Sequence, residues 1–375
     1  MNAVKISIDE RNRGDTILRA EQSRAEQSRA EQSRAEQSRA EQSRAEQNYA
    51  IDIVKYIMAF CVIAIHTLPL KNIKNEVVTS LFDTFVSLAV PFFFLSSGYL
   101  VEKKCEKRND KIFVLNKQIR KLIRYYVIWT AIYLPITIYW FVQSGDGLVK
   151  STALFFRNVI FQGENHYSWP LWYLLSSIYG FMVYKIISKK EKKFELYGIV
   201  AICIAVTLQY SVDYIMAVPV SENHLLGIIF VLIEKTIGKG RIFSGTYYIL
   251  LGALIARTRI FAKAKIILPV LVGTFLAAAF LNLFLMKIIM SVMFFMLVLM
   301  CNCSGDGRKF RRTSTVMYYM HMIFLFVLNM LCKQSMYGFV GFCFCCFMTN
   351  IFAYTLNKNE YCKNNTAVSL LFGSL

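Results

Sequence analysis

The chain has 375 residues, of which 56% are hydrophobic and 15% aromatic, yet its formal net charge is +19. A soluble domain rarely combines these properties, so we expect long apolar stretches separated by concentrated basic segments. Nucleic acid is not the expected partner, because Lys and Arg lie mainly between apolar runs, where lipid topology explains them better.

A segment of low complexity precedes the first apolar run. Residues 20–44 contain five copies of the unit Ala-Glu-Gln-Ser-Arg. Each unit is net neutral and spaces Glu and Arg favourably for a helix, but a period of five leaves no apolar stripe to bury. We therefore expect residues 1–48 to form a cytoplasmic tail, either a solvated helix or a disordered segment, that is separate from the membrane domain.

Deleting residues 20–44 is expected to leave activity intact, because the repeats present no apolar face to the membrane domain. Perfect repetition also predicts slippage of the coding sequence, so the copy number should vary between isolates. The measurement compares the deletion variant with the full chain at equal abundance in the membrane. An inactive deletion variant would give the repeats a part in function.

The first apolar run begins at Ile51, after a polar segment too long for the n-region of a secretory signal peptide, and is expected to be a retained span. Further apolar runs follow, each long enough or nearly so for a hydrocarbon core that takes roughly 20 helical residues. We predict an all-α, polytopic integral membrane bundle of about ten transmembrane helices over residues 49–357, followed by a tail at 358–375. The predicted spans are 51–70, 77–101, 122–142, 170–187, 196–213, 243–256, 266–284, 286–300, 314–332 and 336–356.

The charges between the spans predict the orientation of the chain. Lys and Arg concentrate in every second intervening segment, and the positive-inside rule places such segments in the cytoplasm. Both termini are then cytoplasmic. The basic segments are 103–124, 185–193, 257–265 and 308–312.

Two long segments, at about 143–169 and 214–242, fall on the outer side of the membrane in this topology. Loops of that size usually cover or bind something. The apolar run from Leu225 to Ile233 is too short for a span, so we expect a helix that lies on or dips into the outer surface. The ionisable residues of the two segments include Asp146, Glu164, His166, Glu222, His224 and Glu234.

The first span carries Lys55 and His66, and an ionisable residue inside a span costs about 2.5–3.5 kcal/mol and is therefore a candidate for function. Lys55 and His66 are about three helical turns apart and share one face, with roughly 16 Å between them along the axis. His is the usual general base near neutral pH, so His66 is a candidate for accepting a hydroxyl proton. The alternatives are that His66 bonds a neighbouring carbonyl group and that Lys55 is an anchor at the inner surface.

Polar residues also gather at the inner ends of the second and third spans. The small residues Ser96–Gly98 allow close approach of a helix or of a ligand, and helix packing alone explains them as well. Arg120, Lys121 and Arg124 enter the third span from the cytoplasm. They indicate either attraction to anionic lipid headgroups or a site for the phosphates of a nucleotide-bearing cofactor.

The ninth span carries Ser314, Tyr318 and His321 on one helical face near its inner half. A hydrogen-bond network between helices explains these residues without catalysis. Trp169 and Trp172 open the fourth span at the outer surface, where aromatic belts are expected.

The ten cysteines lie mostly inside apolar runs, where free Cys behaves as a small hydrophobe. Cys301 and Cys303 stand near a cytoplasmic loop, but no second Cys or His pair has a spacing suited to zinc. We therefore expect neither disulfides nor a metal site.

The order of these segments resembles the acyltransferase 3 family, membrane O-acyltransferases that modify bacterial cell-envelope glycans, from about Tyr49 to Tyr354. The first span of that family has an Arg, ten residues and then a His, and here Lys replaces the Arg. Lys offers a point charge instead of a bidentate fork, which puts the role of that Arg in question. The residues that carry the resemblance are Lys55 and His66, Phe93–Gly98, Arg120 and Arg124, Trp172–Leu174, Leu251–Gly252 and Ser314–His321.

The resemblance implies transfer of an acyl group from cytoplasmic acyl-CoA, with acetyl-CoA as the expected donor, to a hydroxyl of a lipid-linked sugar or cell-envelope glycan outside. The expected partners are membrane lipid and that glycan, and the expected location is the bacterial plasma membrane. The resemblance makes His66 the general base. It places Lys55, Arg120, Arg124, Ser97, Tyr318 and His321 at the donor and Trp172 on the acceptor side.

Two other classes of function remain open from the sequence. A helical bundle with scattered polar residues also suits a transporter, although no pair of interrupted half-spans is evident. The membrane portion of vancomycin-resistance serine racemases resembles this first span and is thought to act in serine supply. No racemase domain follows Tyr361, so we expect no racemase activity. A catalytically inactive scaffold is the third reading, and binding of a coenzyme A thioester would separate it from an enzyme.

Overall fold

The computed structural model describes residues 49–108, 110–145, 147–217, 224–258, 264–301, 303, 305–358 and 366–372. The chain divides into two units, and all the features discussed below lie in the unit formed by Ala50–Asn302 and Asp306–Leu375. The described residues form helices and connecting turns without a strand, which confirms the all-α prediction. The predicted tail 1–48, Asp146 and Glu222 lie outside the described residues.

Seven helical segments of the described chain are long and apolar enough to cross a membrane, and three shorter apolar helices accompany them. Together they correspond one to one with the predicted spans. The long segments are Tyr49–Thr67 (α2), Glu76–Glu106, Lys111–Gln143 (α5), Trp169–Ser188, Glu191–Ala217, Arg308–Cys332 (α13) and Phe339–Lys358 (α14). The shorter helices are Ile242–Thr258 (α10), Ala264–Leu281 (α11) and Phe284–Leu299 (α12).

The second predicted span is two helices, Glu76–Ser87 (α3) and Ala89–Glu106 (α4), that meet at Leu88. Pro91 lies in the first turn of α4 and has no N–H to donate to the carbonyl group of Ser87. A continuous helix is therefore interrupted there, whereas the first turn of a new helix tolerates Pro. In the segments Trp169–Ser188 and Glu191–Ala217, a short 3-10 turn leads into Trp172–Ser188 (α7) and Phe194–Ala217 (α8), respectively.

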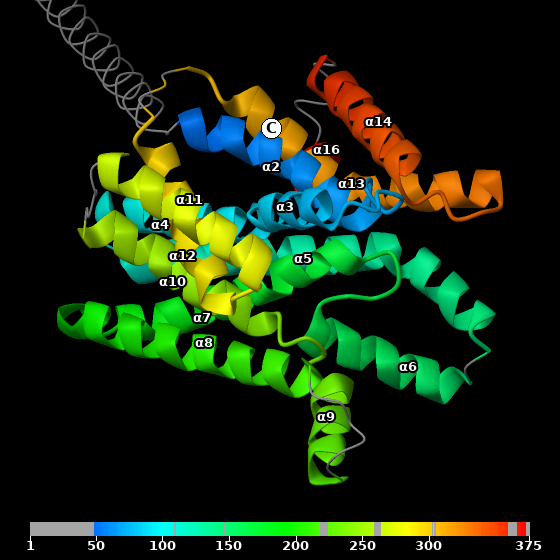
Figure 1. Cartoon of the computed structure of the whole chain (residues 1–375), viewed down its shortest axis with the longest axis horizontal. Helices are drawn as coiled ribbons and strands as arrows, with labels where there is room; N and C mark the ends of the chain where they lie inside the picture. The colour runs from blue at the N-terminus through cyan, green and yellow to red at the C-terminus, as the bar shows by residue number, and fades with distance from the viewer. Residues whose placement is uncertain are drawn as a thin grey trace, which may run out of the picture. The chain divides into compact units, whose positions relative to one another are not determined.

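Helices also occur outside the ten predicted spans, and one of them, in the second outer segment, was predicted. The first long outer segment contains Leu148–Arg157 (α6), and α6 continues into a π-helix at Asn158–Gln162. The apolar run of the second outer segment lies in His224–Thr236 (α9). The predicted C-terminal tail contains Thr366–Phe372 (α16), which packs on α5 and α13 (Figure 1).

Glycines of α4 and α10 let helices approach closely around α10, which packs against α4, α7 and α8 (Figure 1). A Cβ on Gly98 would overlap the carbonyl group of Ile249, and a Cβ on Gly252 would overlap that of Leu95. A Cβ on Gly245 would likewise overlap the backbone of α7. Small residues thus fix the distance between α10 and its neighbours, as in other membrane bundles.

Candidate functional site

A polar cavity of about 220 Å³, here called the basic cavity, opens where α2, α4, α5, α7, α13 and α16 meet. Three cations lie in its wall, one each from α2, α5 and α13. Hydroxyl groups of Ser, Thr and Tyr line much of the remainder. The residues that matter below are Lys55, Ser97, Lys121, Tyr125, Tyr173, Arg311, Ser314 and Tyr318.

Arg311 is held in place by a buried carboxylate. Its Nε lies 3.1 Å from Oδ1 of Asp52, and its Nη2 lies 2.7 Å from Oδ2. The Asp52 side chain is 5% exposed, whereas the Arg311 side chain is 42% exposed and lines the cavity. Such a bidentate pair orients the guanidinium group, because two parallel hydrogen bonds fix its plane.

The charge around Lys55 remains positive after this pairing. One carboxylate, Asp52, and three cations, Arg311, Lys104 and Lys121, act electrostatically on its ammonium group. Cations that face one another in a confined space repel unless an anion lies between them. The basic cavity is therefore suited to an anionic ligand.

Neither Arg120 nor Arg124, the predicted donor residues of α5, is part of the described lining of the basic cavity, whereas their neighbour Lys121 is. Lys121 lines the basic cavity together with Gln118, Leu122 and Tyr125, residues at helical spacing on one face. The Arg124 guanidinium carbon lies 5.4 Å from the centre of the Tyr125 ring, at the edge of this face. Arg120 is exposed and is not part of the described lining. A helical-wheel analysis of the basic segment would have favoured Lys121 over Arg120.

Ser97 and Tyr318, both predicted at the donor, lie in the wall of the basic cavity with Tyr173. The Ser97 and Tyr173 hydroxyl oxygens are 3.2 Å apart, and the rings of Tyr173 and Tyr318 are 5.7 Å apart. The Tyr318 hydroxyl donates to the carbonyl oxygen of Pro170. These contacts connect α4, α13 and α7 with the turn that precedes it, along one side of the cavity.

His321 follows Tyr318 by about one turn of α13, and its ring lies beside that of His66 on α2. The ring centres of His66 and His321 are 5.3 Å apart, so the structure brings together residues from the first and ninth predicted spans. Nδ1 of His321 lies 2.8 Å from the carbonyl oxygen of Met317. A carbonyl oxygen only accepts, so Nδ1 carries the proton that it donates.

The other ring nitrogen of His321, Nε2, is buried and has no hydrogen-bond partner among the described residues. With the proton on Nδ1, the neutral imidazole presents the lone pair of Nε2, the arrangement of a general base or a proton carrier. His66 is partly exposed, and its ring stacks on that of Trp169 with 6.2 Å between the ring centres. The pair therefore joins a fully buried histidine to a partly exposed one.

A second cavity lies at the opposite ends of α5 and α13. It has a volume of about 330 Å³ and is here called the aromatic cavity. The residues that define it are Trp140, His166, Tyr167, Asn329, Gln334 and Tyr337. Both helices thus run from the basic cavity to the aromatic cavity.

The register between α5 and α13 is fixed by contacts of Tyr319, which also lines the basic cavity. The Tyr133 hydroxyl donates to the carbonyl oxygen of Tyr319 at 2.8 Å, and the rings of Trp129 and Tyr319 stack 4.5 Å apart. The helical rise from Arg311 to Asn329 is roughly 27 Å. This is close to the thickness of a hydrocarbon core, about 30 Å, and the histidine pair lies between the two ends.

Trp172, predicted on the acceptor side, is part of neither described lining. The guanidinium carbon of Arg241 lies 5.3 Å from its ring centre, and Arg241 forms a 2.9 Å ion pair with Glu164. Burial raises the pKa of the Glu164 carboxyl, and Arg241 opposes that shift. Trp172 therefore stands beside an ion pair that joins the two outer segments.

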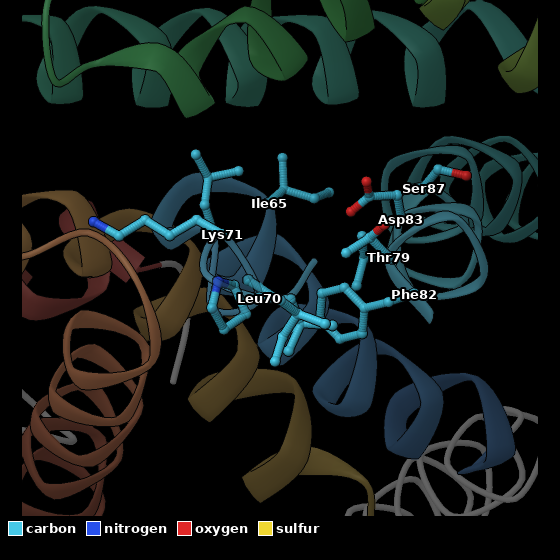
Figure 2. A pocket seen from close by; sticks show the side chains of 12 residues that line it. Ile65, Leu70, Lys71, Thr79, Phe82, Asp83 and Ser87 are labelled. Carbon is cyan, nitrogen blue, oxygen red and sulfur yellow. The ribbon is translucent and has the colours of Figure 1, made fainter. Parts of the chain in front are cut away.

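A third cavity, of about 570 Å³, lies between the end of α2 and α3 (Figure 2). Most of its wall is apolar and includes Ile65, Leu70 and Phe82. Figure 2 shows that the side chain of Lys71 extends away from Asp83. His66 is not part of this lining, so the cavity is separate from the histidine pair.

Among the described residues, no group of three or more His, Cys, Asp or Glu side chains is arranged to hold a metal ion. The residues matched by the comparisons with known proteins include the lining of the aromatic cavity and all of the basic cavity except Phe372. The model of a family described as an acyltransferase domain matches residues 48–358. No solved structure matches the chain significantly.

Two curated relatives carry the names of racemases. An amino-acid racemase of Enterococcus faecalis is 28% identical over 208 residues, which are 55% of this chain and 28% of that protein. A serine/alanine racemase of Enterococcus gallinarum is 34% identical over 97 residues, which are 24% of this chain and 14% of that protein. The matched region is thus less than a third of each relative.

Proposed function

This chain belongs to the acyltransferase family whose model matches residues 48–358, and on that basis we propose that it acetylates a glycan hydroxyl across the bacterial plasma membrane, with acetyl-CoA as donor. Its family and its apolar helices make it a multi-pass membrane acyltransferase. The observation that carries the finer proposal is the pair of histidines between the basic cavity and the opposite end of the bundle.

The donor end is assigned from charge and size. The phosphates of coenzyme A are polyanionic, and Lys55, Lys121 and Arg311 supply charge-assisted donors to them. Cavities for drug-sized ligands have about 300–1,000 Å³, so a cavity of about 220 Å³ takes the thioester arm while the nucleotide stays outside. The basic segments predict a cytoplasmic position for this end.

The histidine pair supports a general-base reaction. His66 takes the proton of the acceptor hydroxyl, and the hydroxyl oxygen attacks the thioester carbonyl carbon. A new C–O ester bond forms and the C–S bond of the thioester breaks. The proton passes from His66 to Nε2 of His321 and on to the sulfur, which leaves as the thiol of coenzyme A.

The connection between donor and histidines runs along α13. Tyr318 lies in the wall of the basic cavity, and His321 follows it by three residues, on the same side of the helix. On α2, Lys55 lines the basic cavity, and His66 lies about three helical turns further along the same face. Two helices thus each carry a group at the donor end and a histidine towards the acceptor.

The test measures release of free coenzyme A from acetyl-CoA by membranes that contain the protein, with and without cell-envelope extract as acceptor. We expect release that depends on the extract and that His66→Ala abolishes. The matched control is Tyr214→Ala, because Tyr214 is 61% exposed on α8 and lines none of the cavities described above. Release that is equal in wild type and His66→Ala would remove His66 from the catalytic role.

Lys121 and Arg120 provide a matched pair for the donor site. Replacing Lys121 with Ala is expected to raise the KM for acetyl-CoA about ten-fold, because a charge-assisted hydrogen bond to a phosphate is lost. Arg120→Ala removes the same charge from a position outside the described lining and is expected to change KM less than about two-fold. Steady-state kinetics at saturating acceptor gives both values, and a larger effect of Arg120→Ala would move the phosphates to that residue.

The racemase names of the two relatives give a second candidate function. Because the membrane portion of serine racemases is thought to act in serine supply, this candidate is an amino-acid permease. Such a protein would carry solute across the membrane without consuming a thioester. Uptake of radiolabelled serine into vesicles distinguishes the two functions. Uptake that persists in His66→Ala, together with no coenzyme A release by the wild type, would replace the acyltransferase proposal.

A further inference from the structure

The aromatic cavity has a wall of stacked rings. The rings of Trp140 and His166 are 3.6 Å apart and 9° from parallel. Tyr167 follows in sequence, and its ring lies 5.8 Å from that of Trp169 at an angle of 15°. Trp140 comes from the end of α5, whereas the other three come from the segment before α7. The fold therefore brings together two stacked pairs of rings from two separate parts of the chain. The pairs are nearly perpendicular, since the ring of His166 is 83° from that of Tyr167 and 77° from that of Trp169. Trp140, His166 and Tyr167 line the cavity, and Trp169 lies behind them.

The backbone at the centre of this wall is strained. Tyr167 has a φ of 60°, a left-handed conformation that costs a residue with a side chain about 1–3 kcal/mol. Its hydroxyl accepts a 2.8 Å hydrogen bond from Nδ2 of Asn329, and Oδ1 of Asn329 accepts one from the backbone N–H of Met336. Asn329 thus ties the wall to the turn between α13 and α14. Strain that is held in this way is a common property of functional sites.

The lining indicates a neutral ligand. None of the described lining residues is Asp, Glu, Lys or Arg, in contrast to the basic cavity. Burial lowers the pKa of His166, so its imidazole is neutral at pH 7 with one donor and one acceptor nitrogen. The amide of Gln334 adds a donor and an acceptor.

Flat rings and neutral hydrogen-bonding groups in one cavity match the chemistry of a pyranose. The C–H face of the sugar packs on an aromatic ring, and its hydroxyls exchange hydrogen bonds with amide and imidazole groups. A phosphate-bearing ligand would find no cation in the described lining. The ligand class that fits is therefore an uncharged sugar residue.

The cavity is connected to the histidine pair through Trp169. The ring of Trp169 lies 5.8 Å from Tyr167 on one side and 6.2 Å from His66 on the other. The backbone N–H of Gly338, at the start of α14, donates to the carbonyl oxygen of Thr67 at 2.6 Å. The end of α2 and the rim of the aromatic cavity thus form one connected structure.

We propose that the aromatic cavity binds a neutral pyranose residue of the acceptor, and that this residue is a neighbour of the one acylated at His66. The proposal rests on the proposed function, which it deepens by assigning a subsite to the acceptor. Trp169 separates the bound residue from His66, so the reacting hydroxyl belongs to the next residue along the glycan. A sugar-binding subsite at this end gives the enzyme its choice of acceptor.

Direct binding tests the subsite without acyl transfer. The purified full chain is held in a zwitterionic detergent that has no sugar headgroup. Saturation-transfer-difference NMR then measures its affinity for three neutral probes: gluco-, N-acetylgluco- and mannotetraose. We expect Trp140→Ala to weaken binding about ten-fold, whereas Trp140→Phe, which keeps an aromatic face, stays within about three-fold. Tyr214→Ala is the control for loss of an exposed aromatic ring elsewhere.

Binding of a neutral oligosaccharide that is lost in Trp140→Ala and kept in Tyr214→Ala supports the subsite. Equal binding to wild type and Trp140→Ala overturns it, and so does an absence of binding for all three probes. Thermal unfolding of each variant checks that the fold is retained, and Trp140→Phe tests the wall if Trp140→Ala fails to fold. Acceptor-dependent release of coenzyme A is measured in parallel, and its absence together with Trp140-dependent sugar binding would overturn the proposed function alone.

Discussion

Replacing His321 with Asn is expected to lower the rate of acyl transfer by about 10²–10⁴-fold, the range for loss of a group that transfers a proton. Asn keeps an N–H that can bond the carbonyl oxygen of Met317, as Nδ1 of His321 does, but it has no counterpart to the Nε2 lone pair. The substitution therefore removes the proposed chemistry and preserves the hydrogen bond within α13. The KM for acetyl-CoA should change little, because His321 is not part of the described lining of the basic cavity.

A double variant separates a relay from two independent contributions. If the proton passes from His66 to His321, the variant that carries His66→Ala and His321→Asn should be about as slow as the slower single variant. Residues that act independently would instead give multiplied losses. Coenzyme A release under single-turnover conditions measures the three rates. A His321→Asn variant with wild-type kcat would make His321 a structural residue of α13.

Replacing Gly252 with Leu is expected to destabilise the membrane bundle by about 3 kcal/mol or more, because overpacking at a backbone contact forces helices apart. A Cβ at this position overlaps the carbonyl group of Leu95 and approaches the backbone nitrogen of Tyr99. Both neighbours are backbone atoms of α4, so no change of side-chain rotamer relieves the overlap. The thermal unfolding midpoint of the purified protein should fall, and less protein should reach the membrane.

Gly273→Leu is the matched control, since it makes the same substitution in the apolar helix α11. A Cβ on Gly273 meets no atom within 4 Å, so the helix gains a side chain without losing a contact. Its unfolding midpoint should stay at or above that of the wild type, because Gly lowers the stability of a helix interior. Equal losses of stability in the two variants would show that close packing at Gly252 is not what holds α4 and α10 together.

Local patterns in the sequence predicted most of the helices. Hydrophobic length identified ten apolar helices, because a bilayer imposes the same length on every span. The break at Leu88 could have been predicted as well, since Pro91 has no N–H to donate to a helix that continues through it. The helix α16 could not have been predicted from a local pattern, because its position depends on the distant Trp129. The Nε1 of Trp129 donates a 3.0 Å hydrogen bond to the carbonyl oxygen of Leu371.

The amino-acid order alone establishes which chemical groups the chain carries and how they follow one another along each helix. The helical repeat placed Lys55 and His66 on one face of α2, and likewise Tyr318 and His321 on α13. Which helical faces meet depends instead on how the helices pack in the folded chain. This packing paired Arg311 with Asp52, set His321 beside His66, and joined Trp140 to His166. Rotation and register between helices depend on contacts between distant segments, such as those of Gly252 and Tyr133, and a local repeat carries no information about them.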